Sequence, residues 1–168
     1  MIFGIIILVL VIVLLALYTY KYNEESFKIS FKESLDLVGV PIITFKNNNK
    51  KYNFILDTGA SNSVINAKVL KQLEYTKIEG SSQLWGMEGN VQHVEYVKMP
   101  LYYWGVEFEE EFQVVNMEES FNKIKEGFGV TVSGILGSSF FNNYNYILDF
   151  KKLVAYTKNK NKKCKKKQ

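Results

Sequence analysis

The sequence predicts a small, mainly β domain with a closed sheet and two short helices, preceded by one membrane-spanning helix. Many short β-branched and aromatic runs are separated by turn residues at close intervals, which is typical of small closed β folds. Hydrophobic residues make up 47% of the 168 residues and aromatic residues 15%, enough to bury a core. The first twenty residues carry no charged side chain.

The uncharged run Met1–Tyr20 is the predicted anchor. Twenty helical residues at about 1.5 Å each span roughly 30 Å, the hydrocarbon thickness of a bilayer. A cleaved signal peptide is the alternative, but no Lys precedes the apolar run and no small-residue cleavage site follows it. Tyrosines and a lysine between residues 18 and 22 are typical of an interfacial belt. We expect a single-pass anchor over 1–22, and the lysines after it favour a cytoplasmic domain.

Charge is divided unevenly along the chain. The net charge is +4, but 7 of the 21 basic residues lie in the tail 158–168, which leaves 14 against 17 acidic residues, a net of −3. Every basic residue is Lys, and the absence of Arg argues against a specific nucleic-acid binder. We expect the Lys-rich tail to be disordered, either as a solvated end or as a contact to anionic lipid or nucleic acid.

A single cysteine, Cys164, and a single histidine, His93, limit the available chemistry. One Cys forms no internal disulfide, and one Cys with one His does not make a metal site, so we expect no metal and no other cofactor. A serine triad is disfavoured because Gly137-Ser138 lacks the Gly-x-Ser-x-Gly elbow. We interpret His93 as a strand or surface residue and Cys164 as inert, with lipidation as the alternative.

The predicted elements of the domain, which spans 35–157, alternate strands with short helices. Strands are assigned to β-branched and aromatic runs between turn residues, and helices to apolar residues at helical spacing. In order, they are a juxtamembrane linker or edge strand over 23–34, strands over 38–45 and 52–56, a short strand over 63–65, a helix over 67–73, a Gly-tipped hairpin over 81–97, a hairpin over 99–104 and 107–115, a helix over 118–127, and closing strands over 144–150 and 153–156.

The stretch Phe54–Ser61 carries the most chemical information. Three apolar residues lead into Asp57, so a buried strand should deliver a carboxylate to its end. Gly59 permits a turn and the close approach of another backbone. Thr58 and Ser61 can donate hydrogen bonds to an ionised carboxylate. An ordinary Asp-initiated turn is the alternative, because Asp, Gly and Ser are common turn residues.

The run Asp57-Thr58-Gly59-Ala60-Ser61 resembles the active-site loop of retropepsin-like (retroviral-type) aspartic proteases, and its Ala is typical of that branch. Ile135-Leu136-Gly137 resembles the family's psi-loop, a later strand that ends in two apolar residues and Gly. The preceding Gly134 fits a bacterial-type member. The resemblance covers about residues 35–156.

The resemblance implies a closed β-barrel of the acid protease fold, with one lobe per chain and a short helix after Gly137. Asp57 would be catalytic, supported by the rest of its loop. Because the chain has one Asp-Thr-Gly, the resemblance implies a homodimer in which each subunit supplies one Asp57, with Thr58 bonding across the twofold axis. Asp149, which lacks that context, would close a strand or make a structural hydrogen bond.

The resemblance also implies a flap that covers substrate, located at the Gly-tipped hairpin. Its residues would be Trp85, Gly86, Met87 and Gly89, and Ile135 would line the substrate cleft. The alternative is an ordinary hairpin tip, with the apolar side chains in the core. The chain departs from the family in having no Arg, in carrying Ser138 where the family often has a charged residue, and in a longer segment over 107–129.

The sequence therefore predicts a membrane-anchored aspartic endopeptidase that binds an extended protein or peptide substrate. Two carboxylates that meet cannot both ionise cheaply, so one keeps a proton while the other activates water. A catalytically inactive peptide-binding or assembly module at the membrane is one alternative. A Lys-tailed protein that tethers lipid or RNA is another.

Overall fold

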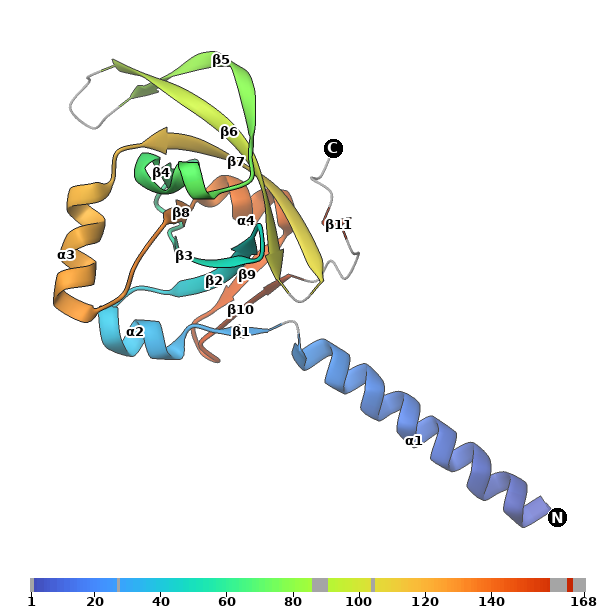
Figure 1. Ribbon diagram of the computed structural model, residues 1–168. Helices are drawn as coiled ribbons and strands as arrows, with labels where there is room; N and C mark the ends of the chain where they lie inside the picture. Colours follow the sequence, from blue (N-terminus) through green and yellow to red (C-terminus); the bar gives the residue numbers. More distant parts are fainter. Residues whose placement is uncertain (1, 27, 86–90, 104, 158–162, 165–168) are drawn as a thin grey trace.

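The computed structural model places a long helix, α1 (Ile2–Ser26), beside a mainly β domain (Figure 1). It describes residues 2–26, 28–85, 91–103, 105–157 and 163–164, with side chains described for 4–19, 28–79, 95–103 and 105–157. The remaining elements are β1 (Ile29–Ser30), α2 (Lys32–Val38), β2 (Ile42–Asn47), β3 (Lys50–Leu56), β4 (Ser63–Asn66), the 3-10 helix η1 (Ala67–Gln72), β5 (Thr76–Trp85), β6 (Val91–Tyr103), β7 (Val106–Val115), α3 (Glu118–Phe128), β8 (Gly134–Leu136), α4 (Ser138–Tyr144), β9 (Tyr146–Asp149), β10 (Val154–Thr157) and β11 (Lys163–Cys164).

Six strands close into a barrel. They follow one another in the order β7, β4, β8, β3, β2 and β6, and β6 pairs again with β7 to complete the ring. β5 extends the sheet beyond β6, and β1, β10 and β9 form a separate three-stranded sheet. The predicted closed, mainly β fold is therefore confirmed. Figure 1 shows the β5–β6 ribbon at the end of the domain far from α1.

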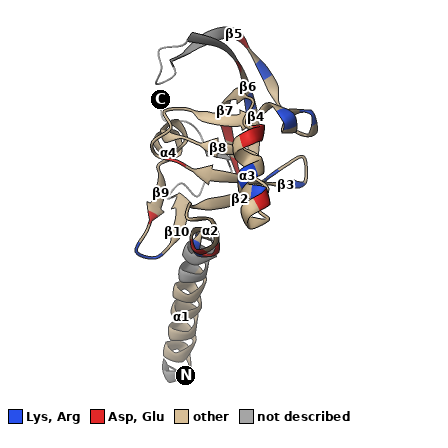
Figure 2. Cartoon of the chain, turned by 90° about the vertical axis from the view of Figure 1, so that its left-hand side faces the viewer, with Lys and Arg blue, Asp and Glu red and all other residues tan. Residues whose placement is uncertain are grey.

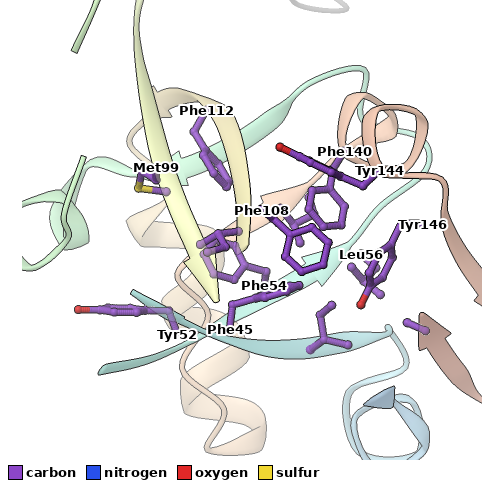
Figure 3. Packing of buried hydrophobic residues seen from close by; sticks show 14 of the residues in the cluster. Phe45, Tyr52, Phe54, Leu56, Met99, Phe108, Phe112, Phe140, Tyr144 and Tyr146 are labelled. Carbon is purple, nitrogen blue, oxygen red and sulfur yellow. The ribbon is translucent and has the colours of Figure 1, made fainter. Parts of the chain in front are cut away.

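Aromatic side chains fill the barrel (Figure 3). Strand alternation explains this, because most inward positions of β2, β3 and β7 carry large apolar residues, with Asn47 and Glu110 as buried polar exceptions, while exposed positions carry Lys and Glu. Fully burying one such side chain stabilises the fold by about 1.5–3 kcal/mol. Rings in mutual contact include Phe45, Phe54, Phe108, Phe112, Phe140, Tyr144 and Tyr146.

The two predicted helices are found close to their expected positions. The first is the 3-10 helix η1, which Asn66 caps by accepting the Lys68 amide at 3.3 Å. The second is α3. The short helix that the resemblance implies after Gly137 is α4. The chain leaves α4 at Asn145 (φ 49°), so the closing strand begins at residue 146 and not at 144.

Two predicted boundaries were wrong, and one segment was correct in part. The edge strand expected within 23–34 is β1, at the edge of the three-stranded sheet, but the segment also holds the end of α1 and the start of α2. The strand expected from residue 38 begins at Ile42, because α2 ends at Gly39, whose left-handed backbone (φ 79°) lets its amide bond Leu35 O at 2.9 Å. The two predicted hairpins share one long strand, β6, which pairs with β5 toward one end and β7 toward the other.

Helix α1 exposes its aliphatic side chains, which are 46–60% accessible from Ile5 to Leu17. Figure 2 shows charged residues on the domain, whereas residues 4–19 of this helix, whose side chains are described, carry no charge. Within the described ranges, the structure holds no helix both long and apolar enough to cross a membrane, so the predicted span stays a prediction. In the Lys-rich tail, β11 pairs in parallel with Glu107 and Phe108 of β7.

Candidate active site

The backbone delivers Asp57 to the end of a strand that is held on both sides. β8 runs parallel to β3, with Leu56 opposite Leu136, and the Asp57 amide donates to Leu136 O at 3.0 Å. On the other side, the Leu56 amide donates to Pro41 O at 2.9 Å. The aspartate therefore follows directly from a strand whose position is set by two neighbours.

The loop after β3 folds back on the Asp57 carboxylate. The Gly59 amide donates to Oδ1 at 2.8 Å, and the Ala60 amide donates to Asp57 O at 3.3 Å. A Cβ on Gly59 would lie 3.1 Å from Oδ1, so glycine allows this close approach. The group that donates a hydrogen bond to the Asp57 carboxylate is thus a backbone amide. Thr58 and Ser61, expected to donate hydroxyls, are exposed and make no such bond among the described residues.

The psi-loop and the start of α4 clamp the Asp57 loop. The Ser138 amide donates to Ala60 O at 2.7 Å, and its hydroxyl donates to Thr58 O at 2.7 Å. The Ser139 amide donates to Ser61 O at 3.1 Å. The structure therefore brings together the two motifs that carry the resemblance, although 80 positions separate Thr58 from Ser138.

Gly137 lies where the two motifs approach most closely. A Cβ at this position would fall 2.5 Å from Asn62 O and 2.8 Å from Ala60 O. These distances are shorter than van der Waals contact, and the atoms belong to the backbone, which has little room to move. Gly134, at the start of β8, is equally confined, with Val64 O 2.4 Å from its Cβ position. Both glycines of this segment are thus required by packing.

Sequence reasoning missed a buried carboxylate behind the loop. Glu110 of β7 is 1% exposed, and its Oε1 accepts the hydroxyls of Ser63 at 3.0 Å and Ser139 at 3.1 Å. Ser63 Oγ in turn accepts the Gly137 amide at 3.2 Å. The available signal was strand alternation, because Glu110 occupies an inward position between Phe108 and Phe112.

The other predicted site residues fall in different settings. Leu136 is buried in the main core, and Ile135 is half-buried against a second cluster that includes Ile42 and Phe121. Trp85 ends β5, which pairs with β6 as the predicted hairpin. The Trp85 side chain and residues Gly86, Met87 and Gly89 lie outside the described residues, so the flap contacts stay a prediction.

The remaining aspartates are explained without catalysis. Asp149 accepts the amides of Lys151 at 3.1 Å and Lys152 at 2.9 Å, which closes the turn between β9 and β10. This confirms the structural hydrogen bond expected of it. Asp36 is an exposed residue of α2. In the described part of the chain, no three His, Cys, Asp or Glu side chains gather in a way that could hold a metal ion.

A closed barrel that presents an Asp-Thr-Gly turn beside a parallel strand defines an acid-protease type of lobe, as the resemblance implies. A protein-family model for aspartyl proteases matches residues 43–140, more than half of the chain, and the chain belongs to that family. No curated protein gives a significant match.

Three solved structures are similar to the chain at low sequence identity. One is EIAV protease in complex with the inhibitor HBY-793, at 19% identity, a TM-score of 0.47 and coverage of 66% of this chain and 93% of that one. Another is the retroviral protease-like domain of Ddi1 from Leishmania major, at 13% identity and a TM-score of 0.48, with coverage of 70% of this chain and 87% of that one. The third is a retropepsin-like aspartic protease from Rickettsia conorii, at 20% identity and a TM-score of 0.43, with coverage of 77% of this chain and 87% of that one.

Proposed function

We propose that this protein is a retropepsin-like aspartic endopeptidase that hydrolyses peptide bonds as a homodimer. The observation that carries the proposal is the setting of Asp57. Its carboxylate is half-buried at the end of a doubly held strand, and Gly59 donates to one of its oxygens. No bond to the other oxygen forms among the described residues, so that oxygen is free for a water or a partner carboxyl. Membership of the aspartyl protease family supports the same role.

A second copy supplies what one chain lacks. The chain carries one Asp-Thr-Gly, so two subunits are needed to bring two Asp57 carboxylates together. At that distance one carboxyl keeps its proton, because two adjacent negative charges repel. The ionised carboxylate then takes a proton from the attacking water, and the protonated one donates to the scissile carbonyl oxygen. Thr58, which is exposed beside each aspartate, is proposed to bond the partner's loop.

The substrate is proposed to bind as an extended peptide beneath the β5–β6 hairpin of each subunit. An extended segment makes main-chain hydrogen bonds, while alternate side chains enter apolar pockets. This part of the proposal rests on the order of the motifs along the chain, since the hairpin tip follows the Asp57 loop and precedes the psi-loop.

We also propose that the run Met1–Tyr20 anchors the domain in a membrane, with the domain on the cytoplasmic side. The support is the absence of charge in this run and the exposed aliphatic surface of α1. Anchored copies share one surface, which raises their effective concentration for pairing. Membrane fractions should retain the full-length protein after carbonate extraction. Release into the soluble fraction would contradict the anchor.

Cleavage by the full-length protein in detergent tests the catalytic proposal. A peptide library should be cut, and Asp57→Asn should lower kcat/KM by at least about 10²-fold, the effect of losing a general acid–base group. Asp36→Asn, an exposed aspartate outside the site, is the matched control and should retain full activity. Sedimentation should show a dimer for all three proteins. Undiminished cleavage by Asp57→Asn, or a monomer at every concentration, would contradict the proposal, and a dimer that binds peptides without cutting them would favour the inactive module.

A further inference from the structure

Glu110 is buried in the barrel, whereas the carboxyl group of Asp57 is half-buried at the end of β3. Glu110 occupies an inward position on β7, in the same row as Val106, Phe108 and Phe112, and is 1% exposed. Burying a carboxyl group among aromatic rings costs free energy unless hydrogen bonds compensate. An apolar residue would fill this row at lower cost, so the carboxyl group needs an explanation other than packing.

Two hydrogen bonds connect Glu110 to residues that hold the loop. Ser63 Oγ donates to Glu110 Oε1 at 3.0 Å, and Ser139 Oγ donates to the same oxygen at 3.1 Å. Ser63 has a single hydroxyl proton, and directing it at Glu110 leaves a lone pair for the Gly137 amide, 3.2 Å away. One carboxyl oxygen therefore fixes a serine on β4 and a serine on α4, and through Ser63 it fixes Gly137.

The residues fixed in this way are those that hold the catalytic loop. Leu136, immediately before Gly137, accepts the Asp57 amide. Ser138, immediately after it, bonds Ala60 O through its amide and Thr58 O through its hydroxyl. Ser139 both donates its hydroxyl to Glu110 and bonds Ser61 O through its amide. These three residues, which bond the loop, are thus each at or next to Gly137 or Ser139, the positions that Glu110 orients.

We propose that Glu110 is a positioning residue that sets the geometry of the Asp57 loop through Ser63 and Ser139. A carboxyl oxygen suits this role because it can accept both hydroxyls at once. The consequence for catalysis rests on the proposed peptidase function, whereas the ordering of Gly137 does not. The two are therefore separable by experiment.

Three variants of the full-length protein test this role. Glu110→Leu keeps the volume and removes the acceptor, Ser63→Ala cuts the link to Gly137, and Glu110→Gln keeps an oxygen that accepts both hydroxyls. Glu111→Gln, on the exposed side of the same strand, is the matched control. The readouts are hydrogen exchange of the Gly137 amide, thermal unfolding, and separate kcat and KM for a cleaved peptide.

The Leu and Ala variants should speed exchange at Gly137 relative to amides of β2, and should lower kcat on the order of 10²-fold with little change in KM, because a displaced reactive group slows chemistry more than binding. Glu110→Gln should recover most of both. Because Ser63→Ala is a small change, it decides the matter if Glu110→Leu fails to fold.

Exchange at Gly137 that matches the wild type in both Glu110→Leu and Ser63→Ala would overturn the proposal, whether or not the protein cleaves peptides. A drop in stability with kcat unchanged per folded molecule would also overturn it, since that is the signature of packing alone. Faster exchange in a protein that cleaves no peptide would contradict the peptidase function and support the positioning role.

Discussion

Two carboxyl groups are linked to the loop after β3, Asp57 at its start and Glu110 through Ser63 and Ser139, and they differ in burial and in bonding. Asp57 is half-buried and accepts a backbone amide from its own loop two residues away. Glu110 is 1% exposed and accepts hydroxyls from two other elements, 47 and 29 positions away. The same functional group is thus available for chemistry at Asp57, which we call the open side of the loop, and is held in internal hydrogen bonds at Glu110, which we call the closed side.

The difference shows how a short loop can be both accessible and rigid. A loop open to substrate has few contacts on its exposed side, so its order must come from behind. Here that order comes from backbone bonds to β8 and α4 and from the hydroxyls that Glu110 holds. Rigid support of this kind keeps a reactive group near its productive geometry. Substitutions on the open side should change activity, and those on the closed side should change stability and activity together.

The largest expected effect on stability is that of Gly137→Ala, which affects both sides at once. The added Cβ would lie 2.5 Å from Asn62 O and 2.8 Å from Ala60 O, so backbone must move. We expect the free energy of unfolding to fall by about 3 kcal/mol, the upper range for overpacked sites. Urea unfolding measures this change.

Gly127→Ala is the matched control. Gly127 lies within α3, and a Cβ there meets nothing within 4 Å. Alanine is favoured over glycine in a helix interior by up to about 1 kcal/mol, so this variant should be slightly more stable. Equal losses in the two variants would show that the Gly137 junction tolerates displacement, and the contrast between the two sides of the loop would fail.

The turn after Asp57 was visible in the sequence because it is local, although the carboxyl group accepts from the Gly59 amide and not from the expected Thr58 and Ser61 hydroxyls. The bond from Gly59 to Asp57 joins residues two apart, so the residue types alone favour it. Short strands separated by closely spaced turn residues likewise predicted a small closed β fold. The pairing of β3 with β8 was not predicted, since the pattern of residues does not specify which strands become neighbours.

The closed side was not visible, because its bonds depend on tertiary register. Ser63 and Glu110 meet only because β4 and β7 pair in parallel with Ser63 opposite Phe112. A carboxyl group in an inward position was a detectable signal, but its partners were not.

Helix α2 was missed for another reason. It is a helix of only 7 residues, none of them fully buried, so it shows no clear apolar stripe. It ends at Gly39 in a left-handed backbone conformation, which the residue type alone does not require.

A smaller effect is expected for Ser138→Ala, which removes only one of the bonds between α4 and the loop. The variant removes the hydroxyl bond to Thr58 O and leaves the amide bond to Ala60 O. Ser138 is only half-buried, so the free energy of unfolding should fall by about 0.5–1 kcal/mol, the lower range for a lost hydrogen bond. Ser138→Thr keeps the hydroxyl and should behave as wild type. A larger loss of stability than in Gly137→Ala would show that the Thr58 contact, and not the Gly137 junction, is the main support of the loop.

The smallest effect concerns a phenol on the barrel surface, away from both sides of the loop. Partial burial, together with the nearby Glu107 carboxylate, raises the pKa of Tyr102 above its ordinary value of 10.0. Tyr102 donates its hydroxyl to Glu107 Oε1 at 3.3 Å. As the pH rises, the unfolded chain releases this proton before the folded protein does. The stabilisation is therefore complete below the unfolded pKa and is lost as the pH rises through the folded pKa.

Unfolding free energies measured in steps from pH 8 to 11 should therefore decline at the alkaline end, and Tyr102→Phe should make that decline shallower. Glu107→Gln should also make it shallower, because it removes the negative charge that disfavours ionised Tyr102. Neither variant should alter peptide cleavage at neutral pH, since neither residue contacts the Asp57 loop. A decline of the same steepness in Tyr102→Phe would assign the alkaline loss of stability to other groups. A change in cleavage would show that the outer surface of the barrel is coupled to the loop, contrary to a support built only from Glu110, β8 and α4.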